Sequence, residues 1–254
     1  MSIEQRQTKL IEIVRRQGKV SVEELATQLN ASRETIRRDL SRLSEAGKIQ
    51  KVHGGASMPR VMGEGSFKQR LSENVDAKME IAKATARLIQ PGETLFIDTG
   101  STTLFFVEAI AHIQGLTIVT NSTEIARTIA TADTSSRVYL LGGEFGSDNS
   151  QTFGAMATMQ VRSFRAHHAI LTIGAMDARS GAMDFNIEEA QVARAMIEQS
   201  ETVTVLADSS KMGALASFEV CPLTLIDRLV TERLPPAEIL DGLQAQGASV
   251  VLPQ

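Results

Sequence analysis

Apolar residues recur every three or four positions in three stretches of the first 57 residues, which is the period of an amphipathic helix. Ser21 followed by Glu24 has the spacing of a capping box, so the second helix is predicted to begin there. The third stretch is the most regular, with apolar positions at i, i+4 and i+7: Ile36, Leu40 and Leu43. Residues 48–52 then alternate polar and apolar before Gly54-Gly55. The pattern predicts three helices followed by a β-hairpin over residues 1–57.

The pattern changes after this segment. Residues 58–75 are rich in Gly, Ser, Pro and charge, which predicts a linker. From residue 76 to 254, nearly continuous apolar runs alternate with helical stretches. The predicted strands are 94–98, 116–120, 137–141, 168–173, 202–207, 227–231 and 249–252. Such runs are typical of a parallel sheet covered by helices on both faces, so the second part is predicted to be an α/β domain.

Charge is divided unevenly between these two parts. The chain has a net charge of -4, yet residues 1–60 hold twelve Lys and Arg against seven Asp and Glu. The N-terminal part is therefore basic and suited to DNA phosphates, whereas the remainder is acidic and does not suggest a membrane surface.

Composition excludes several other classes of protein. No run of eighteen apolar residues exists and the N-terminus lacks a signal-peptide pattern, so we expect a cytoplasmic protein without a membrane partner. The single Cys221 excludes an intramolecular disulfide, and His167-His168 lacks a third ligand at recognisable spacing. We expect neither a metal nor a cofactor. Five methionines are predicted to fill the core or the wall of a pocket: Met156, Met159, Met176, Met183 and Met196.

The third predicted helix carries arginines on the face opposite its apolar stripe. In a winged helix-turn-helix this helix enters the major groove, and arginine suits both guanine and phosphate oxygens. The candidate DNA-binding residues are Ser32, Arg33, Glu34, Thr35, Arg37, Arg38 and Arg42 on the helix, with Lys51 and His53 on the wing. Asp39 is expected to orient one of the arginines. A charged face that is merely solvated is the alternative.

The α/β part carries polar residues just beyond the ends of several predicted strands. Gly100 to Thr103 follow the first strand and open a helix, where backbone N–H groups and hydroxyls suit a phosphate, although Ser and Thr are also ordinary helix caps. Ligands of open α/β sheets bind at the carboxyl ends of strands. The candidate effector-binding residues are Asp98, Gly100, Ser101, Thr102, Thr103, Asn121, Gly143, Asp177 and Lys211.

Two motifs near the N-terminus resemble the DeoR family of sugar-catabolism regulators. Thr35 to Leu40 read TIRRDL and Gly54 to Ala56 read GGA, as in the family, and Phe67, Arg70, Asn74 and Lys78 fit its spacing. The candidate effector-binding residues match the family's motifs except at Gly174 to Asp177, where many members have a G-x-D-G-like run. Residues 181–197 are similar to the glycerol-3-phosphate-type repressors within the family.

The resemblance implies a sensor similar to ribose-phosphate isomerases and sugar-phosphate deaminases. It also implies a dimeric or tetrameric repressor of a carbohydrate or polyol catabolic operon that a phosphorylated sugar or polyol releases from operator DNA. Two alternatives remain at this point: an isomerase-like or deaminase-like enzyme with a DNA-binding head, because fold alone does not decide function, and constitutive DNA binding with a vestigial sensor.

Overall fold

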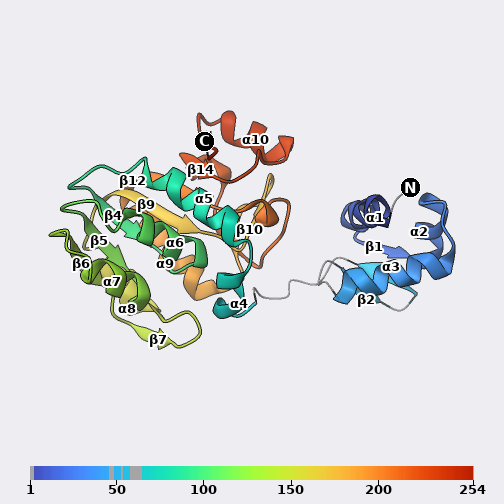
Figure 1. Ribbon diagram of the computed structural model, residues 1–254, viewed down its shortest axis with the longest axis horizontal. Coiled ribbons are helices and arrows are strands. Elements are labelled where there is room, and N and C mark those ends of the chain that lie inside the picture. The colour runs from blue at the N-terminus through green and yellow to red at the C-terminus, as the bar shows by residue number, and fades with distance from the viewer. Residues whose placement is uncertain (1–2, 46–48, 53, 58–64, 254) are drawn as a thin grey trace. The chain divides into compact units, whose positions relative to one another are not determined.

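The computed structural model describes residues 3–45, 49–52, 54–57 and 65–253. The chain divides into two compact units, residues 1–62 and 63–254. Figure 1 shows the elements of both units along the chain. The wing residue His53 lies outside the described residues.

The first unit contains the three predicted helices and the hairpin. The elements are α1 (Ile3–Gln17), β1 (Lys19–Ser21), α2 (Val22–Gln28), α3 (Arg33–Glu45), β2 (Gln50–Val52) and β3 (Gly55–Ser57). The predicted capping box is present, because Ser21 Oγ accepts a hydrogen bond from the Glu24 N–H (3.2 Å) and the Glu24 carboxylate accepts one from the Ser21 N–H (2.8 Å). The sequence pattern missed β1, which pairs antiparallel with β3 and makes the wing a three-stranded sheet among the described residues.

One small core holds the first unit together. Its apolar residues come from all three helices and from the wing: Leu10, Val14, Val20, Leu25, Leu29, Ile36, Leu40, Leu43, Ile49 and Ala56. Because Ile36, Leu40 and Leu43 face this core, the opposite face of α3 is left to the charged residues.

The second unit is built on a parallel sheet that contains all seven predicted strands. The strands are β4 (Thr94–Ile97), β5 (Thr117–Thr120), β6 (Arg137–Leu140), β9 (Ala166–Thr172), β12 (Ser200–Leu206), β14 (Arg228–Val230) and β15 (Ser249–Val251). Within the described chain their order across the sheet is β15-β14-β12-β9-β4-β5-β6, and every neighbouring pair is parallel.

Helices cover both faces of this sheet. They are α5 (Val75–Ala86), α6 (Ser101–Ile110), α7 (Thr123–Ala130), α8 (Ala155–Val161), α9 (Ile187–Glu198) and α10 (Ala237–Gln244). Alternate residues of one strand enter different cores: Leu95 and Ile97 pack with α5, α6 and α7, whereas Phe96 packs with α8 and α9. Burial on both faces explains why a central strand such as β4 has consecutive apolar residues, whereas the edge strand β6 is mostly exposed.

Shorter elements complete the second unit. β7 (Glu144–Gly146) pairs with β8 (Gln151–Phe153), while β10 (Ala175–Asp177), β11 (Gly181–Asp184) and β13 (Phe218–Cys221) form an antiparallel sheet. Two short 3₁₀ helices, η1 (Ser209–Lys211) and η2 (Leu223–Leu225), follow β12 and β13. Cys221 is buried, as expected for a structural thiol, and burial raises its pKa to about 12.

Two sequence-based predictions are wrong. The segment expected to be a linker contains a helix, α4 (Phe67–Ser72), whose Phe67 is buried against the second unit. Of the five methionines, Met176, Met183 and Met196 are buried, but Met156 and Met159 on α8 are 63% and 70% exposed. No helix in the described part of the chain has the length and apolar character that crossing a membrane requires.

Candidate DNA-binding helix and effector site

The helix α3 presents a continuous basic face. Ser32 precedes it and caps it, since its Oγ accepts a hydrogen bond from the Thr35 N–H (3.1 Å). Thr35 is half-buried. The exposed residues of the predicted set are four arginines and one glutamate: Arg33, Glu34, Arg37, Arg38 and Arg42. The structure thus brings the helical candidates together on one side of α3, most of them exposed.

The neighbours of α3 differ in part from those expected. Asp39 is buried and pairs with Arg6 of α1 (2.6 Å) and Gln7 (3.2 Å), rather than with an arginine of its own helix. This is a correction: a carboxylate on the inner side of α3 reaches α1, and it ties the two helices together. Arg33 forms an exposed ion pair with Glu23 of α2. Lys51 Nζ donates to Ser41 Oγ (3.1 Å), so the wing strand β2 contacts α3 directly.

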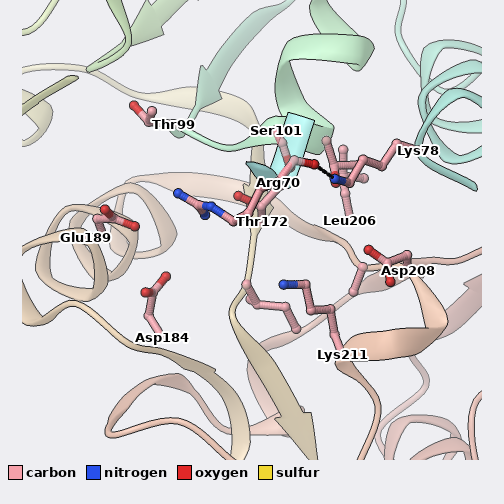
Figure 2. A pocket seen from close by; sticks show the side chains of 13 residues that line it. Arg70, Lys78, Thr99, Ser101, Thr172, Asp184, Glu189, Leu206, Asp208 and Lys211 are labelled. Carbon is pink, nitrogen blue, oxygen red and sulfur yellow. Dashed lines mark hydrogen bonds between the residues drawn. The ribbon is translucent and has the colours of Figure 1, made fainter. Parts of the chain in front are cut away.

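A small cavity opens at the carboxyl ends of β4, β9 and β12 in the second unit. It is lined by polar side chains and a few apolar ones: Arg70, Lys78, Thr99, Ser101, Thr102, Thr172, Ile173, Asp184, Glu189, Leu206, Ala207, Asp208 and Lys211. In Figure 2 the amino groups of Lys78 and Lys211 lie on one side, the carboxylates of Asp184 and Glu189 on the other, and the Arg70 guanidinium between them.

Three cationic side chains therefore line one cavity. Lys78 of α5 is only 3% exposed, which is unusual for a lysine, and its Nζ donates to the Arg70 carbonyl oxygen. Burial lowers the pKa of Lys78, a shift that the nearby Asp208 carboxylate opposes and Lys211 reinforces. Asp208 is held in place by Asn74, whose Nδ2 donates to Asp208 Oδ1 (3.2 Å). Asp208 offsets part of this positive charge, and an anionic ligand beside Lys78 and Lys211 would add to that compensation.

The start of α6 faces the same cavity. Ser101 and Thr102, the first two residues of α6, line it, and helix N-termini favour anions through their backbone N–H groups and dipole. Gly100 precedes them where a Cβ atom would overlap the Thr172 side chain, so only glycine allows the loop to lie this close to the end of β9. This arrangement is suited to a phosphate group.

A second, smaller cavity shares Thr99, Asp184 and Glu189 with the first. Asp98 and Asn121 line it as well. Asp98 accepts hydrogen bonds from the Thr172 N–H (2.7 Å) and side chain. Burial raises the pKa of Asp98 well above its ordinary range, and the neighbouring Asp184 adds to the effect while the Thr172 hydrogen bonds oppose it. The carboxyl oxygens of the residues that line this cavity can accept hydrogen bonds from the hydroxyl groups of a ligand.

Besides Gly100, three predicted effector residues lie outside both cavities among the described residues. The Thr103 hydroxyl donates to the carbonyl oxygens of Asp98 and Gly100 (both 3.1 Å) and so braces the loop. Gly143 lies in the turn before β7, where its positive φ of 154° and its approach to Phe153 explain a glycine. Asp177 accepts hydrogen bonds from the N–H groups of Arg179 (3.0 Å) and Ser180 (3.1 Å) and so closes the turn between β10 and β11.

Several residues that line the main cavity are not among the effector-binding residues predicted from the sequence. The clearest signal was available on α5, where Lys78 lies on the stripe of Ile81, Ala82 and Thr85, since a lysine on a buried helical face calls for a partner. Glu189 similarly shares the inner face of α9 with Ala193 and Met196. Arg70 was noted only for its spacing, and Thr172 and Asp184 carry no local signal.

Comparisons with known proteins cover both units. Residues 6–60 match the family described as "DeoR-like helix-turn-helix domain", and residues 73–233 match "DeoR C terminal sensor domain". The chain belongs to the DeoR family of transcriptional regulators. It is 34% identical over 239 residues to the glycerol-3-phosphate regulon repressor of Escherichia coli (strain K12), covering 94% of each chain. It is 32% identical to the HTH-type transcriptional repressor CsqR of the same strain, covering 98% of this chain and 95% of the relative.

This DeoR-family chain is a DNA-binding transcriptional regulator rather than an enzyme, because its relatives over the full length are named repressors. Among solved structures, it is similar to ribose 5-phosphate isomerase A from Neisseria gonorrhoeae, with a TM-score of 0.39, 18% identity and coverage of 53% of this chain and 52% of that one. It is also similar to eIF2B beta from Chaetomium thermophilum, with a TM-score of 0.48, 14% identity and coverage of 97% and 70%.

Proposed function

We propose that this regulator represses a carbohydrate or polyol catabolic operon and is released from operator DNA by a phosphorylated sugar or polyol. The observation that carries the proposal is the meeting of Arg70, Lys78, Lys211 and the start of α6 at one cavity. A repressor of the glycerol-3-phosphate regulon among its relatives supports the same class of effector.

The two sides of the cavity suit the two ends of such an effector. The phosphate would accept hydrogen bonds from Lys78, Lys211 and the N–H groups at the start of α6. The hydroxyl groups would donate to Asp184, Glu189 and the more deeply placed Asp98. A ligand with a second anionic group at its far end would meet these carboxylates, so we expect a neutral sugar or polyol chain.

The basic face of α3 would hold the operator. Arg33, Arg37, Arg38 and Arg42 are exposed for contacts with bases or phosphates, and Lys51 lies beside them on the wing. Ser32, Glu34 and Thr35 belong to the same proposed DNA-contacting set, Ser32 mainly as the cap that fixes the start of α3. This role places the protein in the cytoplasm, with the DNA that it regulates.

Self-association into a dimer or tetramer is part of the proposal. Each first unit offers one recognition helix, and repressors of this type bind paired half-sites as symmetric oligomers. Large exposed apolar side chains occur on three elements, β6, β7 and α8: Tyr139, Phe145, Met156 and Met159. A second copy of this chain would cover such side chains, so replacing Met156 and Met159 with Glu should lower the mass measured by light scattering.

The test combines operator binding with effector release in one assay. Purified protein is bound to DNA from upstream of its own gene cluster and challenged with glycerol 3-phosphate, ribose 5-phosphate or glucose 6-phosphate. Unphosphorylated glycerol, ribose and glucose are the controls. We expect at least one phosphate ester to release the DNA and to raise the unfolding temperature, while its parent compound does neither; saturation at 100 times Kd adds about 2.7 kcal/mol of stability.

Variants locate the response in the cavity. Thr102→Ala and Lys211→Ala should still bind the operator but resist release by the active phosphate ester. Release of the wild type by unphosphorylated compounds, or normal release of both variants, would contradict the proposed site.

A further inference from the structure

The helix α4 connects the effector cavity to the part of the chain that leads to the DNA-binding unit. The last described residue of that unit is Ser57, and α4 begins at Phe67. The same helix supplies Arg70 to the lining of the cavity. α4 is therefore the sensor helix that lies nearest in sequence to the first unit.

α4 packs beside α6, and contacts of Phe67 and Arg70 also hold it against the rest of the sensor. Phe67 is buried, and its N–H donates a long hydrogen bond to Asp148 Oδ2 (3.4 Å). Arg70 Nη2 donates to Asn149 Oδ1 (3.0 Å), and the Arg70 carbonyl oxygen accepts from Lys78. Because the latter two contacts use cavity side chains, the attachment of α4 depends on what those side chains bind.

The partner of Arg70 belongs to a network that borders the cavity. Asn149 is 6% exposed, and its Nδ2 donates to Glu189 Oε1 (2.8 Å), which also accepts from Gln151 Nε2 (2.7 Å). Glu189 lines both cavities. A ligand that binds Glu189 and Arg70 would thus act on both ends of the Arg70–Asn149 contact.

We propose that Arg70 is a positioning residue that couples effector binding to operator release. The inference rests on the proposed function, because it requires an anionic effector in the cavity. A phosphate attracts the Arg70 guanidinium and the Lys78 ammonium more strongly than a neutral amide or carbonyl oxygen does. The effector therefore competes for both groups, the contacts to Asn149 and to the Arg70 carbonyl oxygen break, and α4 takes a different position or loosens. The free energy of this competition links the two sites.

The decisive variant is Asn149→Ala, which removes the competing acceptor and leaves all three cations of the cavity in place. In the full-length protein it should lower operator affinity without effector by about 5-fold or more. It should also raise the affinity for the active phosphate ester, because the ligand no longer competes with Asn149. If Asn149 only supported the fold, its removal would not weaken operator binding and strengthen effector binding at the same time.

A second variant and a matched control guard against a loss of folding. Asp148→Ala removes the weaker tether of α4 at an exposed position and should change both affinities in the same directions, by less. Lys68→Met removes an exposed cation of α4 that does not line the cavity, and it should change neither affinity.

Hydrogen–deuterium exchange of residues 66–73 gives an independent readout. Addition of the active phosphate ester should raise exchange there in the wild type, and Asn149→Ala should already exchange at that raised rate without ligand. If the ester releases the operator while Asn149→Ala binds both partners as the wild type does, the coupling role of Arg70 is wrong and the proposed function stands. If no phosphate ester binds or releases the wild type, both are wrong.

Discussion

The two units of this regulator place their functional cations in opposite surroundings. The arginines of α3 stand exposed on the outer face of a helix, whereas Lys78 is 3% exposed inside the sensor. Exposed charges interact through water and are screened by salt, while desolvated charges interact more strongly and shift their pKa values. The first arrangement suits a long polyanion that is bound by many modest contacts. The second suits a small anion that must be held by few.

The largest effect is expected from Lys78→Met, which removes a buried cation from the effector cavity. Affinity for the active phosphate ester should fall by about 10-fold to 150-fold, since charged hydrogen bonds contribute about 1.5–3 kcal/mol. Operator affinity without effector should fall as well, but by less, because Lys78 also donates to the Arg70 carbonyl oxygen and so helps to hold α4. The measurement is isothermal titration calorimetry beside a DNA-shift assay.

Lys83→Met provides the matched control, because Lys83 is an exposed cation on the same helix. An equal loss of effector affinity in both variants would mean that net charge, and not the position of Lys78, attracts the ligand.

Arg37→Ala tests the exposed side of the comparison. Loss of one base or phosphate contact should weaken operator binding by about 5-fold to 150-fold, corresponding to about 1–3 kcal/mol. The thermal shift produced by the effector should not change. Lys9→Ala, at an exposed cation of α1, is the control, and unchanged operator affinity of Arg37→Ala at fixed salt would refute the assignment of α3 as the recognition helix.

The pH dependence of effector binding should reflect the buried environment of Lys78. Its pKa is lowered in the free protein, and a bound phosphate raises it again, so binding takes up a proton between these two pKa values. Affinity should therefore decrease several-fold as the pH rises through that range, earlier than an ordinary lysine would allow. Titrations from pH 7 to 10 should show this decrease in the wild type and a flatter profile in Lys78→Met.

The smallest effect is a local one in the first unit. Ser21→Ala removes the cap of α2 and should lower the free energy of unfolding of the DNA-binding unit by about 1 kcal/mol. The sensor should unfold as before. Calorimetry with two resolved transitions would check this, and a shift of the sensor transition instead would show that the two units do not unfold independently.

Helices and strands that leave a pattern in neighbouring residues could be predicted from the amino-acid sequence alone. Periodicity predicted the three helices of the first unit, and apolar runs predicted all seven strands of the parallel sheet, because burial of one helical face or of both sheet faces leaves a pattern in neighbouring residues. The glycine turn that opens a helix likewise pointed to Ser101 and Thr102, which line the cavity. The pairing of β1 with β3 and the helix α4 were missed, because elements of three to six residues have no clear period.

Which polar groups share a site depends on the packing of elements that are distant in the chain, and this could be seen only in the folded structure. Four residues of the cavity come from different elements or their ends: Arg70, Lys78, Asp184 and Lys211. The sheet order that brings them together cannot be inferred from their local spacing. Contrary to the predictions from sequence, Gly143 and Asp177 lie outside the cavity, and Met156 and Met159 are exposed. The physical reason is that burial and charge pairing depend on neighbours distant in the chain, whereas helix and strand patterns depend on neighbours within it.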